Sequence, residues 1–191
     1  MSNNTELDKD NLLNRLDRLL EWIKSCDTKS SIVLAGIGIF LTIFTTDYII
    51  NVIKNILVNL VKNINFSNIL YLLLFAVSIG FLIYGTYCLT RVLVPRLEKD
   101  NVADEGRPVD SLYFFETIAK NNYGQFKDKM NNTTKEEEIE DILSQIYVNA
   151  RICTFKYQYS SKGIKFSFIG IAGVILLYVV GLILMKMGGF Q

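Results

Sequence analysis

Three long apolar stretches organise the chain, at residues 31–50, 68–94 and 166–185. The first carries one charge, Asp47, near its end; the second is uncharged until Arg91; the third has no charge. A bilayer core about 30 Å thick is crossed by roughly 20 apolar helical residues. Helices buried in soluble bundles rarely run that far without a charge. The pattern therefore predicts an all-α integral membrane protein with three transmembrane helices.

Basic residues beside these stretches predict the orientation, because cytoplasmic flanks carry the excess of Lys and Arg. On one side the flanks hold ten such residues: Arg15, Arg18, Lys24, Lys29, Arg91, Arg96, Arg151, Lys156, Lys162 and Lys165. The other side has only Lys54, Lys62 and Lys186. We expect residues 1–30 and 95–165 to be cytoplasmic, and residues 51–67 and the tail 186–191 to lie outside.

The polar segments next to the first and third stretches carry helical seams with spacings of three and four. One seam is Leu12, Leu16, Leu19, Ile23 and Cys26. The other is Ile139, Leu143, Ile146, Ala150, Cys153, Tyr157, Ser160 and Ile164. Both segments are expected to form amphipathic helices that run into the membrane as a cytoplasmic stalk. The seams pack on each other within one chain or on neighbouring copies in a homo-oligomer.

Polar and small residues inside the membrane region raise further expectations. Residues 51–65 predict an amphipathic helix that lies on the outer leaflet or lines a water-filled path. Small residues permit close helix approach, at the Ala76 and Gly80 pair and at Gly170, Gly173 and Gly181. The polar cluster at the end of the first stretch is a candidate membrane path, with ordinary solvation as the equal alternative: Thr42, Thr45, Thr46 and Asp47.

Composition excludes several kinds of chemistry among the 191 residues. The chain has no histidine, which removes the commonest general base and metal ligand, so neither an enzyme nor a metal site is expected. Twenty basic residues nearly balance 19 acidic ones, so the net charge of +1 does not indicate nucleic-acid binding. Cys26, Cys88 and Cys153 are widely spaced and are expected to be reduced, buried thiols. No cofactor is implied.

Residues 111–130 mix aromatic side chains with lysines. Aromatic faces beside cations can stack on a base and hold its phosphate. Aromatic residues more often form packed cores, so both interpretations stay open.

Short motifs resemble the family of Pycsar effector membrane proteins. A leucine-seamed helix ends in the sequence from Trp22 to Ser31, which fits the pattern W-x4-D-x-K-[AS]-S directly before a transmembrane stretch. Two close spans follow, then the run Phe114 to Ala119, then Lys156-Tyr157 on a helix into the third span. Cys26 stands where the family pattern leads us to expect alanine.

The resemblance implies a bacterial inner-membrane effector of antiphage defence. Such an effector responds to a cyclic nucleotide such as cCMP or cUMP, which a companion cyclase makes on infection. It then impairs or depolarises the membrane, and the infection is aborted. No separate nucleotide-binding domain is visible, so the cytoplasmic helices or a partner must form the receptor surface.

Candidate nucleotide contacts follow from the basic and aromatic residues near the membrane. They are Trp22, Lys29, Arg151, Lys156, Tyr157, Tyr159 and Lys162, against the alternatives of an interfacial anchor and positive-inside flanks. Asp27 is expected to cap a helix break or to pair with Lys24 or Lys29. The rival interpretation is a small oligomeric membrane scaffold that recruits a soluble partner and conducts no ions.

Overall fold

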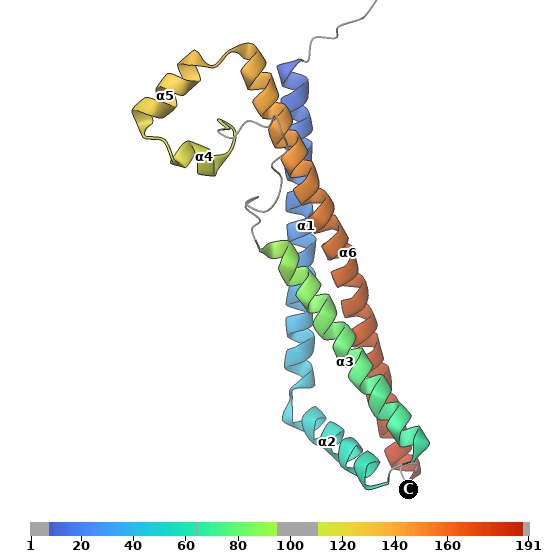
Figure 1. Ribbon diagram of the computed structural model, residues 1–191. Helices are drawn as coiled ribbons and strands as arrows, with labels where there is room; N and C mark the ends of the chain where they lie inside the picture. The colour runs from blue at the N-terminus through green and yellow to red at the C-terminus, as the bar shows by residue number, and fades with distance from the viewer. Residues whose placement is uncertain (1–7, 64, 95–110, 189–191) are drawn as a thin grey trace, which may run out of the picture. The chain divides into compact units, whose positions relative to one another are not determined.

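The computed structural model describes residues 8–63, 65–94 and 111–188, and all their regular structure is α-helical. Figure 1 shows the helices along the chain. They are α1 Lys9–Phe44, α2 Asp47–Lys62, α3 Phe66–Leu93, α4 Phe115–Ala119, α5 Tyr123–Asn132 and α6 Lys135–Met187. Two predicted regions lie partly outside the described residues. They are the cytoplasmic region at residues 95–110, which includes Arg96, and the tail at residues 189–191.

The chain divides into two units. The head unit comprises residues 1–25 and 95–156, and the span unit comprises residues 26–94 and 157–191. The 36-residue α1 and the 53-residue α6 each continue from one unit into the other without interruption. The prediction that both polar helices run directly into apolar ones is therefore confirmed.

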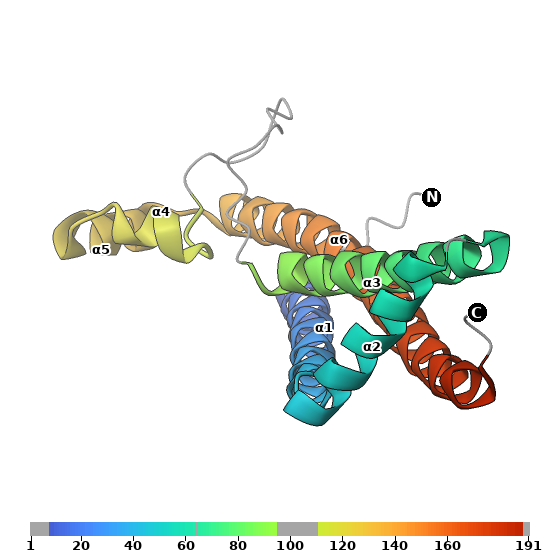
Figure 2. The ribbon, with the colours of Figure 1, turned by 90° about the horizontal axis from the view of Figure 1, so that it is seen from below.

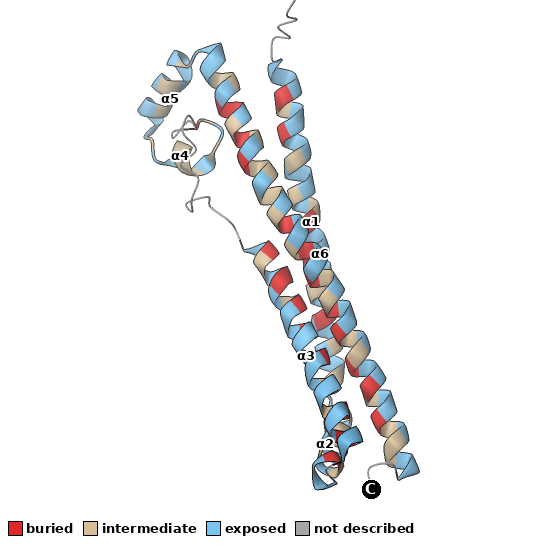
Figure 3. Ribbon diagram, turned by 45° about the vertical axis from the view of Figure 1, so that its right-hand side comes forward, coloured by how far each residue is buried: buried red, intermediate tan, exposed pale blue. Residues whose placement is uncertain are grey.

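Three helices, α1, α3 and α6, are long and apolar enough to cross a membrane. Within the most apolar 18 residues of each of these helices, at most 22% is buried inside the protein. Outward-facing apolar side chains are what a lipid environment favours. Figure 3 shows exposed residues along the whole length of α3 and the membrane part of α6. The predicted class, an all-α protein with three membrane-spanning helices, is confirmed.

The first apolar helix ends earlier than the sequence predicted, at Phe44 rather than residue 50. The hydroxyl of Thr45 donates to the carbonyl of Leu41 at 2.9 Å, and Thr46 adopts an extended backbone conformation before α2. Asp47 begins α2, where the positive end of the helix dipole favours a carboxylate. These local interactions favour a turn at 45–46, so Asp47 does not belong to the first span.

The predicted seam on α1 is confirmed, and it extends into the apolar half. Every member is buried or half-buried: Leu12, Leu16, Leu19, Ile23, Cys26, Ser30, Val33, Ile37, Phe40 and Phe44. The expected helix break at Asp27 is wrong, because α1 is continuous through it. A regular seam with one period on both sides of Asp27 requires an unbroken helix.

The predicted seam on α6 is displaced by about one residue in the head unit. Ile142, Gln145 and Val148 are buried, whereas the predicted Leu143 is 38% exposed. In the span unit the predicted Tyr157 is 68% exposed, and Ser160 and Ile164 lie on the inner face as expected. The displacement follows from buried hydrogen bonds of the head unit, described below, which turn a polar face of α6 inward.

The span unit has two apolar clusters. Ile37 of α1 packs with Leu82 and Leu89 of α3, and with Ile164 and Ile171 of α6. The second cluster joins α2 to the other helices through Ile56, Leu60, Tyr71 and Leu177. The amphipathic helix predicted at 51–65 is present as α2, which follows α1 and precedes α3 (Figures 1 and 2). Part of its apolar stripe, Ile56 and Leu60, packs on protein.

Glycines allow α3 and α6 to approach closely. A Cβ atom on Gly170 would lie 2.5 Å from the backbone nitrogen of Leu82, and one on Gly85 would lie 2.4 Å from the backbone nitrogen of Ser167. The expectations for Gly170, Gly173 and Gly181 are confirmed, since each has neighbours this close. The pair Ala76 and Gly80 is exposed, with open space beside Gly80, so that expectation is wrong within one chain.

The three cysteines are free thiols, as the sequence predicts. Cys26 and Cys88 are buried, whereas Cys153 is only half-buried, so the expectation of burial fails for Cys153. Cys153 lies in the displaced part of the α6 seam, which accounts for its exposure.

We predict that Gly170→Ala destabilises the span unit by about 1–3 kcal/mol, because the added methyl group must push α3 and α6 apart. The matched control is Gly80→Ala, which enters open space and is expected to be neutral or stabilising by up to about 1 kcal/mol. Thermal unfolding of the detergent-solubilised chain measures both effects. Equal melting temperatures for the two variants would contradict the observed packing.

Candidate functional site

A buried polar network joins residues 111–112 to α6 in the head unit. Ser111, Asp141 and Gln145 are all buried. The backbone N–H of Leu112 donates to Oδ2 of Asp141 at 2.7 Å, and Nε2 of Gln145 donates to Oγ of Ser111 at 3.0 Å. Buried polar groups are costly unless paired. These bonds therefore hold residues 111–112 against α6 and explain why its polar face points inward.

A second polar cluster lies at the surface of the head unit. Nζ of Lys9 donates to Oε1 of Glu138 at 2.7 Å, and the hydroxyl of Tyr113 donates to the same oxygen at 2.9 Å. The bond from Lys9, followed by that from Tyr113, lowers the pKa of the Glu138 carboxyl. Burial, followed by the bond to Glu138, raises the pKa of the Tyr113 phenol. The cluster ties α1, α6 and the segment before α4 together.

Local capping defines the helices between these clusters. Asn122 and Gln125 form a reciprocal capping box at the start of α5, and Thr134 and Glu137 form another before α6. The bonds from Thr134 lower the pKa of the Glu137 carboxyl. The polar linker predicted at residues 131–134 is thus present in part, because α5 continues to Asn132.

The aromatic residues of 111–130 are unevenly exposed. Phe114 and Phe115 have ring centroids 4.9 Å apart, and Phe115 is 66% exposed. Tyr123 is also exposed, and Phe126 is half-buried. None of these aromatic side chains is fully buried, so the exposed ones are available to solvent.

The head unit holds three of the residues predicted to contact a nucleotide. Trp22 of α1 is 60% exposed. Arg151 of α6 is exposed, with its guanidinium 5.8 Å from the ring centroid of Tyr147. Lys156 is buried and makes contacts of its own. A buried lysine is less accessible to a ligand than the sequence suggested.

The span unit holds the other four residues, and it brings two of them together. The ring of Tyr159 has the guanidinium of Arg91 at 5.9 Å and the ammonium of Lys162 at 6.0 Å from its centroid. We call Arg91, Tyr159 and Lys162 the Tyr159 cluster. Lys29 and Tyr157 are exposed and are not members of it.

Among the sequence-based predictions, Arg91 is one of the basic flanks that set the orientation and is not a candidate nucleotide contact. The available signal was its position as the single charge of the second apolar stretch, near the end of α3. Only the packing of α3 on α6 places it beside Tyr159. Arginine and lysine are side chains that recognise phosphate, so this pair of cations from two helices is a candidate phosphate site.

The candidate membrane path lies at the end of α1 and the start of α2. The hydroxyls of Thr42 and Thr46 donate to the carbonyls of Gly38 and Ile43 at 2.9 and 3.0 Å, and Thr45 bonds in the same way to its own helix. Asp47 is exposed. All four residues reach the protein surface, so the structure leaves both of the sequence-based alternatives open.

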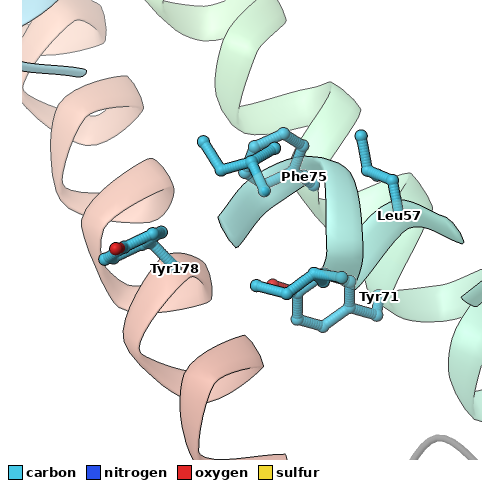
Figure 4. Close-up of a pocket in the computed structure, with 6 residues that line it drawn as sticks. Leu57, Tyr71, Phe75 and Tyr178 are labelled. Atoms are coloured by element: carbon cyan, nitrogen blue, oxygen red, sulfur yellow. The ribbon is translucent and has the colours of Figure 1, made fainter. Parts of the chain in front are cut away.

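An apolar crevice near α2 differs in character from the Tyr159 cluster. It is lined by Ile53, Ile56, Leu57, Tyr71, Phe75 and Tyr178 (Figure 4). Its lining carries no charged side chain. Among residues 8–63, 65–94 and 111–188, no three His, Cys, Asp or Glu side chains are grouped so that they could hold a metal ion.

The fold and these sites define a three-span helical membrane protein with two helices that continue into a polar head. Residues 11–185 match the family model described as the Pycsar effector protein domain, and the chain belongs to this family. It is 30% identical to the Pycsar effector protein GmPycTM of Gulbenkiania mobilis over 165 residues, which cover 82% of this chain and 84% of that protein. No solved structure matches it.

Family membership makes the chain a transmembrane effector of Pycsar antiphage defence in bacteria. The family resemblance seen in the motif from Trp22 to Ser31 is confirmed. The matched range includes α2 to α5 and most of α1 and α6, so the resemblance is not confined to the short motif.

We predict that Glu138→Gln lowers the stability of the head unit at neutral pH by less than about 1 kcal/mol. The folded-state pKa of Glu138 lies below the ordinary value of 4.5, so its ionised form favours folding above that pH. This contribution disappears as the pH falls through the lowered pKa. Thermal unfolding between about pH 3 and pH 7 measures it.

The matched control for this prediction is Glu140→Gln, an exposed carboxyl two residues further along α6. It should leave the pH profile close to that of the unmodified chain. If the melting temperature of the Glu138→Gln variant falls with decreasing pH as steeply as that of the unmodified chain, the bonds from Lys9 and Tyr113 do not stabilise the head.

Proposed function

We propose that this effector binds a cyclic mononucleotide such as cCMP or cUMP on its cytoplasmic side and then depolarises the bacterial inner membrane. A companion cyclase supplies the nucleotide, and the loss of membrane potential aborts the infection. The observation that carries the proposal is the continuity of α1 and α6, which join the head to the membrane helices without a break. The unbroken backbone of each helix is the covalent route by which a displacement in the head reaches the membrane helices.

The Tyr159 cluster is the surface we assign to the cyclic phosphate. Arg91 and Lys162 are like charges, and each is attracted to the ring of Tyr159. A phosphate diester bound between the two cations relieves their mutual repulsion. Charge-assisted hydrogen bonds to such a group are each worth about 1.5–3 kcal/mol.

A phosphate at this cluster also has a means of changing the structure. Arg91 belongs to α3 and Lys162 belongs to α6. A ligand shifts a conformational equilibrium only through its different affinities for the two states. Because the phosphate contacts both helices, its affinity depends on the distance between them.

Orientation and assembly complete the proposal. The basic flanks favour a cytoplasmic head and N-terminus, with the C-terminus outside. Exposed side chains on the head helices, among them Trp22 and Leu143, are available to neighbouring copies, which supports a homo-oligomer in the bilayer. The chain acts by binding rather than by catalysis, consistent with its lack of histidine.

The test is a voltage-sensitive dye in proteoliposomes that contain the full chain, before and after addition of a panel of cyclic mononucleotides and oligonucleotides. We expect one nucleotide to depolarise the vesicles. Arg91→Gln and Lys162→Gln should each raise the concentration needed by about tenfold or more, since each removes a charge from the phosphate site. Lys165→Gln, an exposed lysine on the next turn of α6, is the matched control and should respond normally.

Two outcomes would contradict the proposal in different ways. No response to any nucleotide, with the protein folded and inserted, would favour the membrane scaffold that conducts no ions. A nucleotide response that is the same in Arg91→Gln, Lys162→Gln and Lys165→Gln would retain the effector but remove the Tyr159 cluster from its site.

A further inference from the structure

The interior of the span unit contains buried hydroxyl groups from all three membrane helices. Ser30 of α1 and Ser160 of α6 have their hydroxyl oxygens 3.1 Å apart. On α3, the hydroxyl of Ser78 donates to the carbonyl of Leu74, and that of Tyr71 donates to the carbonyl of Leu177 on α6. We call these groups, together with Ser167 of α6, the hydroxyl track. All five residues are buried.

Ser167 differs from the other members of the track. Its side chain is fully buried, and its Oγ has no hydrogen-bond partner among the described residues. Leaving a buried hydroxyl unpaired costs about 1–3 kcal/mol relative to a hydrated one. The close packing of α3 on α6 therefore carries a free-energy cost at Oγ of Ser167.

The track runs from the proposed cytoplasmic end of the apolar helices into the membrane. Ser160, Ser167 and Leu177 mark successive levels on α6, and Ser78 lies at the level of Gly173, where a Cβ atom would be 2.4 Å from its Oγ. The third apolar stretch begins at residue 166, so Ser160 lies on its cytoplasmic side, and the distance along α6 from Ser167 to Leu177 is about 15 Å at 1.5 Å per residue. A hydrocarbon core is about 30 Å thick. Polar groups thus recur across about half of its depth.

The observed packing closes this track to water. A Cβ atom on Gly85 would lie 2.4 Å from Oγ of Ser167, and one on Gly163 would lie 2.7 Å from the side chain of Leu89. Helix surfaces in such close contact leave no room for a water molecule, which needs two to four polar partners and its own volume. The close approach of α3 and α6 at Gly85 excludes water from Ser167, and the Ser167 hydroxyl is therefore left without a partner.

We propose that the hydroxyl track is the surface along which water and small cations enter the bilayer from the cytoplasmic side when α3 and α6 separate. The inference rests on the proposed function, because it names the path by which the effector depolarises the membrane. Hydroxyl and carbonyl oxygens replace part of the hydration shell of a cation, as they do in other channels. Hydration of Ser167 on opening removes the cost of its unpaired hydroxyl, which lowers the energy of the open state relative to the closed one.

The proposal also explains how a phosphate at the Tyr159 cluster reaches the membrane interior. Arg91 lies on α3 two turns beyond Gly85, and Lys162 lies on α6 five residues before Ser167. Both are on the pair of helices whose contact buries Ser167. A change in the distance between these helices at the cluster therefore acts directly on the track.

The first test is Ser167→Ala in the full chain. Alanine removes the unpaired hydroxyl and fits the same space, so the closed bundle should melt at a higher temperature in detergent. The concentration of nucleotide that depolarises proteoliposomes should rise about five- to tenfold. The matched control is Ser161→Ala, an exposed serine one position beyond Ser160, which should change neither quantity.

The second test is the accessibility of a cysteine at position 167 to a membrane-impermeant cationic thiol reagent. It uses Ser167→Cys in a chain whose three native cysteines are alanine, provided that this background depolarises like the unmodified chain. We expect modification only with the activating nucleotide, and none at the lipid-facing control Ile175→Cys. If the background does not respond, Ser167→Ala decides the question.

The outcomes separate this inference from the proposed function. Depolarisation by a nucleotide, with residue 167 unmodified and Ser167→Ala unchanged in its nucleotide response, would overturn the track and keep the effector. A chain that responds to no nucleotide would overturn both. In that case the melting temperature of Ser167→Ala would still report whether the unpaired hydroxyl destabilises the closed bundle, and an unchanged value would refute that part separately.

Discussion

The close contact between α3 and α6 is the constraint on which the span unit depends. Gly85, Gly163 and Gly170 lie where any larger side chain would collide with the facing helix. In a bilayer, helix association is driven by packing and hydrogen bonds rather than by the hydrophobic effect, so small residues at the contact are decisive. The same closeness places Arg91 beside Tyr159, buries Ser167 without a partner, and leaves the remaining apolar faces for lipid.

Buried polar groups shape both units. In the head, buried Asp141 and Gln145 pair with residues 111–112 and determine which face of α6 points inward. Each unit also holds one buried oxygen with no hydrogen-bond partner among the described residues, Oδ1 of Asp141 in the head and Oγ of Ser167 in the span unit. Paired groups specify one arrangement, whereas an unpaired group weakens the arrangement that contains it.

Two continuous helices, α1 and α6, connect the head unit to the span unit. The seam of α1 keeps one period from Leu12 to Phe44, with Ser30 replacing an apolar residue at the first turn of the apolar half. The seam of α6 includes the buried Lys156 at the junction of the two units. Both helices thus carry a polar residue on their inner face near the junction.

The sequence by itself determined the class of protein, because a run of some 20 apolar residues has few stable solutions outside a bilayer. It also determined the seam of α1, the continuity of α6 into the third span and the family, which depends on motifs of adjacent residues. The tertiary structure alone decided the displaced seam on α6 and the Tyr159 cluster. Each depends on hydrogen bonds or contacts between residues far apart in the chain, such as Ser111 with Gln145 or Arg91 with Tyr159. Periodicity reports which face of a helix is apolar, and only the neighbouring helix determines which face is buried.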